Sequence, residues 1–269
     1  MKLSVITITY KDAPGLALTL QSLKPLQASG ISWEHVIVDG SPEENASTLS
    51  ALEKDWPLKH IQSAPRGVYA AMNDGIQGMS GNAAWFLNGG DQLRDVGTLQ
   101  ALLSRFTSEP AIEMICSGVD LVRDGQYLYS KFPNPEFLRN LLGTNRICHQ
   151  GIIYRSDLFK KVGTYNTHYK FAADYEHLFR CYFANVTALC LPDRLALYDM
   201  GGLTGGGLAQ LPELQKVRRW ANSQMPSPLA LQNEILGRLE TLRLLIVKKV
   251  ASSFMGNFLR PIWIAWNRR

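Results

Sequence analysis

The N-terminal segment places the strongest constraint on the fold of this chain. Residues 3–10 read Leu-Ser-Val-Ile-Thr-Ile-Thr-Tyr. This run is rich in β-branched residues and too short for a helix, so it predicts a buried strand. Pro14 stands where a first-turn proline would, and the leucines that follow predict a helix that reaches about Gln27. A second strand is expected at 35–38, before a helix that starts at Pro42.

The alternation of strands and helices continues along the chain. Further strands are expected at 59–63, 83–87, 111–117, 125–130 and 147–154, and further helices at 68–79, 97–107, 173–184 and 212–222. This order predicts an α/β fold with a mostly parallel, Rossmann-like sheet and helices on its faces. Ligands of such sheets bind at the carboxyl ends of the strands, so loops 9–13, 39–42 and 88–92 are the candidate site loops.

The glycine-rich segment 201–207 is the clearest break in regular structure. It predicts a mobile loop over the site and a boundary between a catalytic domain, 1–207, and a helical, basic C-terminal extension, 208–269. From residue 238 onward the chain holds seven basic residues and one acidic residue, whereas the 237 residues before it hold 21 basic and 22 acidic. The positive charge is therefore local, and we expect no nucleic-acid partner.

The composition is that of an ordinary globular protein, with 46% hydrophobic and 19% charged residues. Residues 1–20 do not have the pattern of a signal peptide, and no window is apolar enough to predict a membrane-spanning helix. We therefore expect a cytoplasmic protein. Its four cysteines show no CxxC spacing, and we interpret them as free packing residues.

Three aspartates, Asp12, Asp39 and Asp91, each follow a predicted strand. A single aspartate at such a place is usually a turn or cap residue. Together, however, they are expected at one edge of the sheet, where carboxylates suit a nucleotide. One carboxylate can accept hydrogen bonds from a base or ribose, and another can hold a divalent ion against a diphosphate.

Four ordered motifs resemble the nucleotide-sugar motifs of the family 2 glycosyltransferases, which have the GT-A fold. They are Thr9-Tyr10-Lys11-Asp12, Val38-Asp39-Gly40-Ser41, the segment 66–75 and Phe86-Leu87-Asn88-Gly89-Gly90-Asp91. Segments 148–151, 172–180 and 195–204 extend the likeness to a bacterial subgroup that includes colanic-acid, O-antigen and exopolysaccharide transferases. The resemblance covers roughly residues 2 to 205.

The resemblance implies an inverting transfer of sugar from a nucleotide diphosphate sugar to a glycan acceptor. Asp174 matches the catalytic base of the family, and Asp91 matches the last carboxylate of its metal-binding motif, which implies Mg²⁺ or Mn²⁺. The residues that the resemblance assigns to the donor pocket or its surroundings are Thr9, Tyr10, Asp12, Asp39, Asn73, Asn88 and His149.

Two features keep other functions open. Segment 88–91 offers one carboxylate where the family pattern has two or more, which reduces the charge available to a hard cation. Ala70 and Asp74 also replace an Asp and a Lys of that pattern. The alternatives are a nucleotidyltransferase and a catalytically decayed nucleotide-sugar-binding protein. For Asp174 itself the alternative role is to cap the predicted helix.

The C-terminal extension carries an apolar stripe at helical spacing: Leu244, Val247, Ala251, Phe254 and Phe258. Lys248 and Lys249 stand beside it, and two tryptophans and two arginines follow. Such a segment is suited to the headgroup layer of an anionic membrane. It predicts peripheral attachment at the inner face of the cell membrane and a lipid-linked acceptor. The alternative is that the stripe packs on the catalytic domain.

Overall fold

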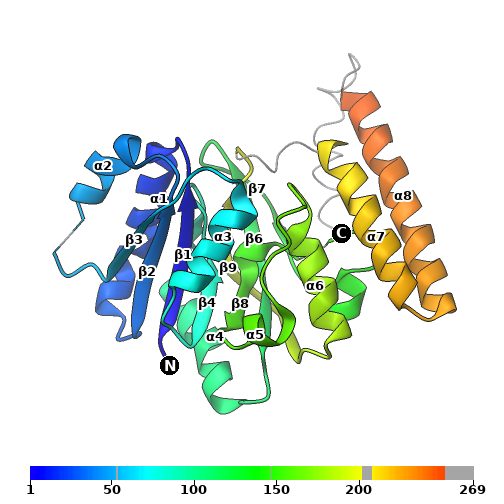
Figure 1. Ribbon diagram of the computed structural model, residues 1–269, viewed down its shortest axis with the longest axis horizontal. Coiled ribbons are helices and arrows are strands. Elements are labelled where there is room, and N and C mark those ends of the chain that lie inside the picture. Colours follow the sequence, from blue (N-terminus) through cyan, green and yellow to red (C-terminus); the bar gives the residue numbers. More distant parts are fainter. Residues whose placement is uncertain (53, 146, 202–207, 252–269) are drawn as a thin grey trace.

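The computed structural model describes residues 1–52, 54–145, 147–201 and 208–251. Within them, nine strands form one mixed sheet of order β3-β2-β1-β4-β8-β6-β9-β5, with β7 paired to β6 (Figure 1). The strands are β1 Leu3–Thr9, β2 Trp33–Asp39, β3 Leu58–Gln62, β4 Ala83–Phe86, β5 Gln92–Leu93, β6 Met114–Arg123, β7 Gln126–Lys131, β8 Ile152–Arg155 and β9 Ala188–Asp199.

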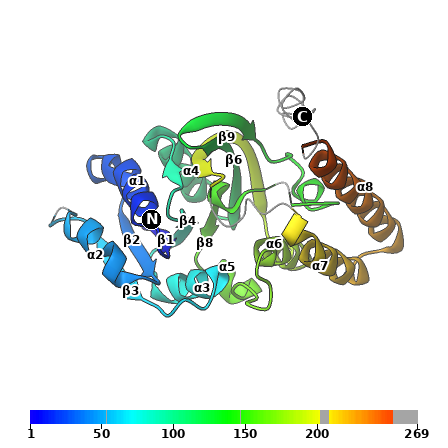
Figure 2. The ribbon, with the colours of Figure 1, turned by 90° about the horizontal axis from the view of Figure 1, so that it is seen from above.

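Helices flank the sheet and extend beyond one end of it (Figures 1 and 2). They are α1 Ala13–Leu23, α2 Pro42–Ser50, α3 Val68–Gly78, α4 Val96–Ser108, α5 Leu158–Val162, α6 Ala173–Phe183, α7 Leu211–Gln224 and α8 Ser227–Ala251, with 3-10 turns η1 Lys24–Ala28, η2 Phe137–Asn140 and η3 His149–Gly151. The α/β class and the helix-flanked sheet predicted from the sequence are confirmed.

The central strand β1 shows why the sheet needs helices on both faces. All seven of its residues are buried, and successive side chains point to opposite faces. Ile6 and Ile8 join a core cluster that also contains residues of α3 and α6. Leu3 and Val5 join a second cluster with residues of α1 and α4. A strand that is apolar on both faces therefore lies between two helical layers.

The parallel half of the sheet gathers three strand ends at one edge. Strand β1 pairs in parallel with β2 and β4, and β2 pairs in parallel with β3. Thr9 lies opposite Asp39, and Ile6 lies opposite Phe86 at the end of β4. The loops that follow β1, β2 and β4 consequently leave the sheet on the same side, as the strand order predicted.

The second half of the sheet differs from the sequence prediction. The strand expected at 147–154 is η3 followed by the short β8, so His149 and Gln150 lie in a turn. Strand β6 begins at 114 and extends to 123, and β5, α5 and β9 were not predicted. Strand β9 carries exposed Pro192 and Asp193 in its middle, where the register with β6 shifts. This bulge tolerates a proline inside a strand and hides the strand pattern.

Helices α7 and α8 pack against each other at the end of the molecule opposite α2 (Figures 1 and 2). Val217 and Ala221 of α7 are buried in the same core cluster as α6. The division into domains 1–207 and 208–269 stays a prediction, and residues 202–207 of the expected loop lie outside the described residues. Within the part that the structure describes, no helix is long and apolar enough to cross a membrane.

Candidate active site

The loop after β1 is built by Asp12, which caps α1. Its Oδ1 accepts a hydrogen bond from the amide of Gly15 at 2.9 Å. The 88–91 loop passes close by, because a Cβ on Gly89 would lie 3.7 Å from Asp12 Oδ2 and 3.6 Å from Thr9 Oγ1. Thr9 Oγ1 is buried and has no partner among the described residues. Tyr10 is half exposed at the same edge, and the role of these residues in donor binding stays a prediction.

Asp39 is fully buried and orders the loop after β2. Its Oδ1 accepts from the Ser41 amide at 2.8 Å and from Asn45 Nδ2 at 2.7 Å. Its Oδ2 lies 3.1 Å from His60 Nε2. Both oxygens are therefore engaged by the protein, and contact between Asp39 and a base or ribose stays a prediction.

Asn73 connects helix α3 to the segment before α6. Its Nδ2 donates to the carbonyl of Tyr165 at 2.8 Å, and its Oδ1 accepts from the Tyr165 amide at 2.9 Å. The side-chain amide thus holds a backbone segment 92 residues away. The next residue, Asp74, forms an ion pair at 2.7 Å with Arg66, which lies just before α3.

Asn88 and His149 meet over the end of β4. Asn88 Nδ2 lies 3.0 Å from His149 Nε2, while Asn88 Oδ1 is buried without a partner in the described residues. Burial lowers the pKa of His149, and the Asp174 carboxylate partly opposes this effect. The imidazole is therefore neutral near pH 7, and Nε2 accepts from the Asn88 amide.

Asp91 is 3% exposed and is held from two sides. Its Oδ2 accepts from Gln150 Nε2 at 3.0 Å, and its Oδ1 accepts from the Asp199 amide at 3.0 Å. Burial raises the pKa of Asp91 to about 7, and the Asp199 carboxylate adds to the rise, although the hydrogen bonds oppose it. Asp91 therefore ties the 88–91 loop to η3 and to β9.

Asp199 is a site residue that the sequence reasoning did not single out. Its Oδ2 lies 3.5 Å from the position of a Cβ on Gly90, and its Oδ1 accepts from the Gly201 amide at 3.0 Å. Strand β9 therefore delivers a second carboxylate to the 88–91 loop. The sequence signal was present in the resemblance of segment 195–204, but only the pairing of β9 with β5 shows where this residue lies.

The side-chain oxygens near Gly90 are the candidate ligands of the expected metal ion. Among residues 1–52, 54–145, 147–201 and 208–251, no group of three or more His, Cys, Asp or Glu side chains is arranged to hold a metal ion. The free buried Oδ1 of Asn88 and the Oδ2 of Asp199 are nevertheless hard oxygen donors. Mg²⁺ is commonly bound by one or two carboxylates together with substrate phosphates. The donor set therefore fits a cation shared with a diphosphate, and direct ligation by Asp91 stays a prediction.

Asp174 lies in the first turn of α6. Its Oδ1 accepts from Tyr69 Oη at 3.1 Å and from the Tyr175 amide at 2.8 Å, while Asn145 Nδ2 lies 3.4 Å from its Oδ2. Burial and the nearby carboxylate raise the pKa of Tyr69 well above its ordinary value, so the phenol remains a donor. Tyr69 and Asn145 were not predicted, because their contact with Asp174 arises only in the tertiary structure.

The start of α6 is fixed by a carboxylate from α7. The two oxygens of Glu213 accept from the amides of Lys170 at 2.8 Å, Phe171 at 2.7 Å and Ala172 at 3.1 Å. Ala172, not Asp174, occupies the cap position of the helix. Glu213 therefore anchors the segment that leads into α6, while Asp174 Oδ2 has the single long contact with Asn145.

Comparison with known proteins identifies the family of this chain. The sequence profile of glycosyl transferase family 2 matches residues 4–167. This chain belongs to glycosyltransferase family 2. It is 33% identical over 181 residues to an uncharacterized glycosyltransferase of Mycobacterium tuberculosis, covering 66% of this chain and 67% of that protein. It is 31% identical over 182 residues to a PGL/p-HBAD biosynthesis glycosyltransferase of Mycobacterium bovis, covering 66% and 69%.

Solved structures share the fold at low sequence identity. Residues 1–349 of Staphylococcus aureus TarS in complex with UDP-GlcNAc superpose with a TM-score of 0.64 at 16% identity, covering 96% of this chain and 75% of that chain. The mannosyltransferase PcManGT from Pyrobaculum calidifontis, in complex with GDP-Man and Mn²⁺, gives a TM-score of 0.58 at 15% identity, covering 98% and 79%. The GT-A fold is thereby confirmed, and the chain is a glycosyltransferase.

Proposed function

We propose that this glycosyltransferase moves a sugar from a nucleotide diphosphate sugar to a hydroxyl of a lipid-linked glycan, with inversion at the anomeric carbon. The reaction would belong to the synthesis of a bacterial surface polysaccharide, such as an exopolysaccharide or O-antigen. Support for the donor class comes from fold neighbours with UDP-GlcNAc and GDP-Man. Support for a lipid-linked acceptor comes from the basic C-terminal extension.

The observation that carries the proposal is the hydrogen bonding of the two carboxylate oxygens of Asp174. Tyr69 and the Tyr175 amide both donate to Oδ1, whereas Oδ2 has only the 3.4 Å contact with Asn145. No cation forms an ion pair with this carboxylate among the residues described. Oδ2 is therefore the atom that takes the proton of the acceptor hydroxyl as that hydroxyl attacks the anomeric carbon. General-base action of this kind contributes about 10²–10⁴-fold in rate.

The donor pocket in this proposal lies at the strand ends. Thr9, Tyr10, Asp12 and Asp39 surround the base and ribose, while His149 and Asn88 face the diphosphate. A divalent cation, Mg²⁺ or Mn²⁺, supplies positive charge to the leaving diphosphate when bound. Asn88 and Asp199 would hold it, and Asp91 would keep both in place, because its amide donates to the Asn88 carbonyl and its Oδ1 accepts from the Asp199 amide.

A transfer assay separates this proposal from its alternatives. Purified enzyme is first screened by thermal shift against nucleotide diphosphate sugars with and without Mn²⁺, since a ligand that binds the folded state raises stability. The donor that binds is then incubated with a lipid-linked acceptor, and the anomeric configuration of the product is determined by NMR. Release of pyrophosphate from a nucleoside triphosphate would indicate a nucleotidyltransferase. Donor binding without transfer or hydrolysis would indicate a decayed enzyme.

A further inference from the structure

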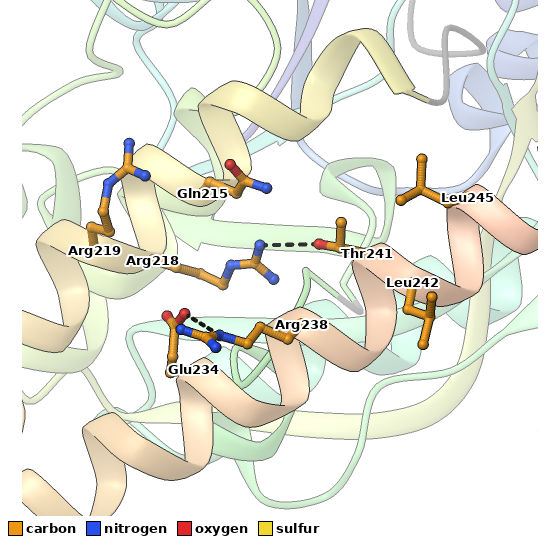
Figure 3. Close-up of a pocket in the computed structure, with 8 residues that line it drawn as sticks. All are labelled: Gln215, Arg218, Arg219, Glu234, Arg238, Thr241, Leu242 and Leu245. Atoms are coloured by element: carbon orange, nitrogen blue, oxygen red, sulfur yellow. Dashed lines mark hydrogen bonds and ion pairs between the residues drawn. The ribbon is translucent and has the colours of Figure 1, made fainter.

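A pocket of about 360 Å³ lies between α7 and α8, away from the strand-end site (Figure 3). Arginines and leucines line it together: Arg218, Arg219, Arg238, Leu242 and Leu245, with Gln215, Glu234 and Thr241. Three guanidinium groups therefore share the pocket with a single carboxylate. That carboxylate, Glu234, is paired with Arg238 at 2.9 Å, which leaves the pocket with net positive charge.

Arg218 forms part of this pocket and is a buried cation. It is 6% exposed, and its Nη1 donates to the carbonyl of Gly143 at 2.7 Å. Figure 3 shows the guanidinium reaching from α7 toward Thr241 of α8. A Cβ on Gly237 would overlap this group, so α8 carries a glycine where the arginine lies against it. No carboxylate forms an ion pair with Arg218 in the described part of the chain, and a buried cation of this kind is stabilised by an anion.

An apolar stripe runs along α8 beside the pocket. Its members are Leu231, Ile235, Leu239, Leu242 and Ile246, whose exposed fractions lie between 50% and 62%. The spacings of four and three residues place them on one helical face. Leu242 belongs to both the stripe and the pocket. An exposed apolar face of this length marks an interaction site.

This stripe is not the one predicted from the sequence. Leu244, the only predicted member whose side chain is described, is half-buried. It lies seven residues after Gly237, hence on the face of α8 that meets Arg218 and the buried Asn233. The side chains of Val247 and Ala251 are not described, and Phe254 and Phe258 lie outside the described residues. The face of α8 that is open to a partner is the opposite one.

The charges beside the stripe distinguish between its possible partners. The arginine-lined pocket beside the stripe has net positive charge, so this surface complements a partner that offers anions next to hydrocarbon. An anionic bilayer presents phosphates to the arginines and hydrocarbon to the leucines.

We propose that the α7–α8 pocket binds the phosphate of an anionic phospholipid, while the stripe inserts between the acyl chains of the same leaflet. This inference rests on the proposed function for the membrane location, and it names the surface that makes the contact. The full-length protein is tested by sedimentation with two kinds of vesicle. One is pure phosphatidylcholine, and the other also contains about 30 mol% of the anionic lipid phosphatidylglycerol.

Two sets of variants remove the positive charges of the pocket and the apolar side chains of the stripe separately. Each cation near an anionic surface contributes about fivefold in binding, so Arg219→Gln with Arg238→Gln is expected to weaken binding by about 30-fold. Ile235→Ser and Leu239→Ser are each expected to weaken it by at least about tenfold. The matched controls are Arg105→Gln with Arg139→Gln and the exposed Leu18→Ser, none of which lies on α7 or α8, and these are expected to bind as the wild type does.

Four results would overturn the inference. The first is equal binding of the wild type to both vesicle types, and the second is unchanged binding of the α7–α8 variants. The third is a concentration-dependent dimer in sedimentation velocity that Leu239→Ser abolishes, which would assign the stripe to a second copy. Release from vesicles by millimolar inorganic phosphate at constant ionic strength would assign the pocket to a soluble anion. Donor hydrolysis in solution is measured on the same samples, so a failure of the proposed transferase activity is seen independently.

Discussion

The burial of Asp91 predicts how the stability of the folded protein changes with pH. Its pKa is raised to about 7 by burial, whereas the ordinary value is 3.8. Between these two values the folded protein holds a proton that the unfolded chain has released, so stability falls as pH rises. The slope is about 1.4 kcal/mol per pH unit, and the total loss from pH 4 to pH 7 is roughly 4 kcal/mol. Below pH 4 the stabilising contribution of the protonated group is fully present.

Asp91→Asn removes this titration and keeps the shape. The Asn Oδ1 still accepts from the Asp199 amide, and a flip of the Gln150 amide lets its oxygen accept from Asn Nδ2. We therefore expect the variant to gain stability relative to wild type as pH rises from 5 to 8, by about 2–3 kcal/mol. The free energy of unfolding is measured by urea denaturation of both proteins, without donor or metal, at each pH unit.

Asp95→Asn is the control, because it removes an aspartate that is not buried. The Asp95 side chain is half exposed, and its hydrogen bonds with Thr98 lower its pKa. Its contribution to stability changes only below about pH 4, so Asp95→Asn should show a constant difference from wild type between pH 5 and 8. A difference for Asp91→Asn that is equally constant over this range would refute the reasoning about the buried carboxyl.

Three further predictions concern the site. Asp174→Asn should lower kcat by at least about 100-fold with donor affinity retained, whereas Tyr69→Phe should have a smaller effect; a variant with a tenth of wild-type kcat would exclude the base role. Asp39→Ala should mainly raise KM for the donor, whereas Asp199→Asn should weaken Mn²⁺ binding measured by calorimetry in the presence of nucleoside diphosphate; equal defects in both variants would contradict these separate roles. Glu213→Gln should lower kcat with little change in KM, because the start of α6 loses a charged acceptor of three amides; an unchanged kcat would show that Asp174 does not depend on it.

The sequence predicted the site edge well because a simple rule governs it. Asp12 follows β1 and Asp39 ends β2, and parallel neighbours end on the same side of the sheet. Asp174 could be found only through the family resemblance, since its helix start alone indicates a cap. Asp199 was missed because the bulge at Pro192 and Asp193 interrupts the pattern of β9.

Helix α8 shows a second limit of sequence reasoning. It carries apolar residues on two faces, and periodicity alone does not say which face meets the protein. The inward face contains Asn233 and Gly237, which look unsuited to a core. Asn233 accepts from the Gly143 amide at 2.8 Å, and Gly237 makes room for Arg218. These two tertiary contacts, invisible in the sequence, turn the leucine stripe outward.

The pairing of β5 with β9 has a consequence for the order of folding. Gln92 and Leu93 pair with Leu197 and Ala196, about a hundred residues later in the chain. A ribosome that adds about 5–20 residues per second takes roughly 5–20 s to cover that distance. Strands β1 to β4 are complete before then, but the 88–91 loop still lacks the amide of Asp199. Nascent chains arrested before residue 199 are therefore expected to hold the first half of the sheet without a finished catalytic centre.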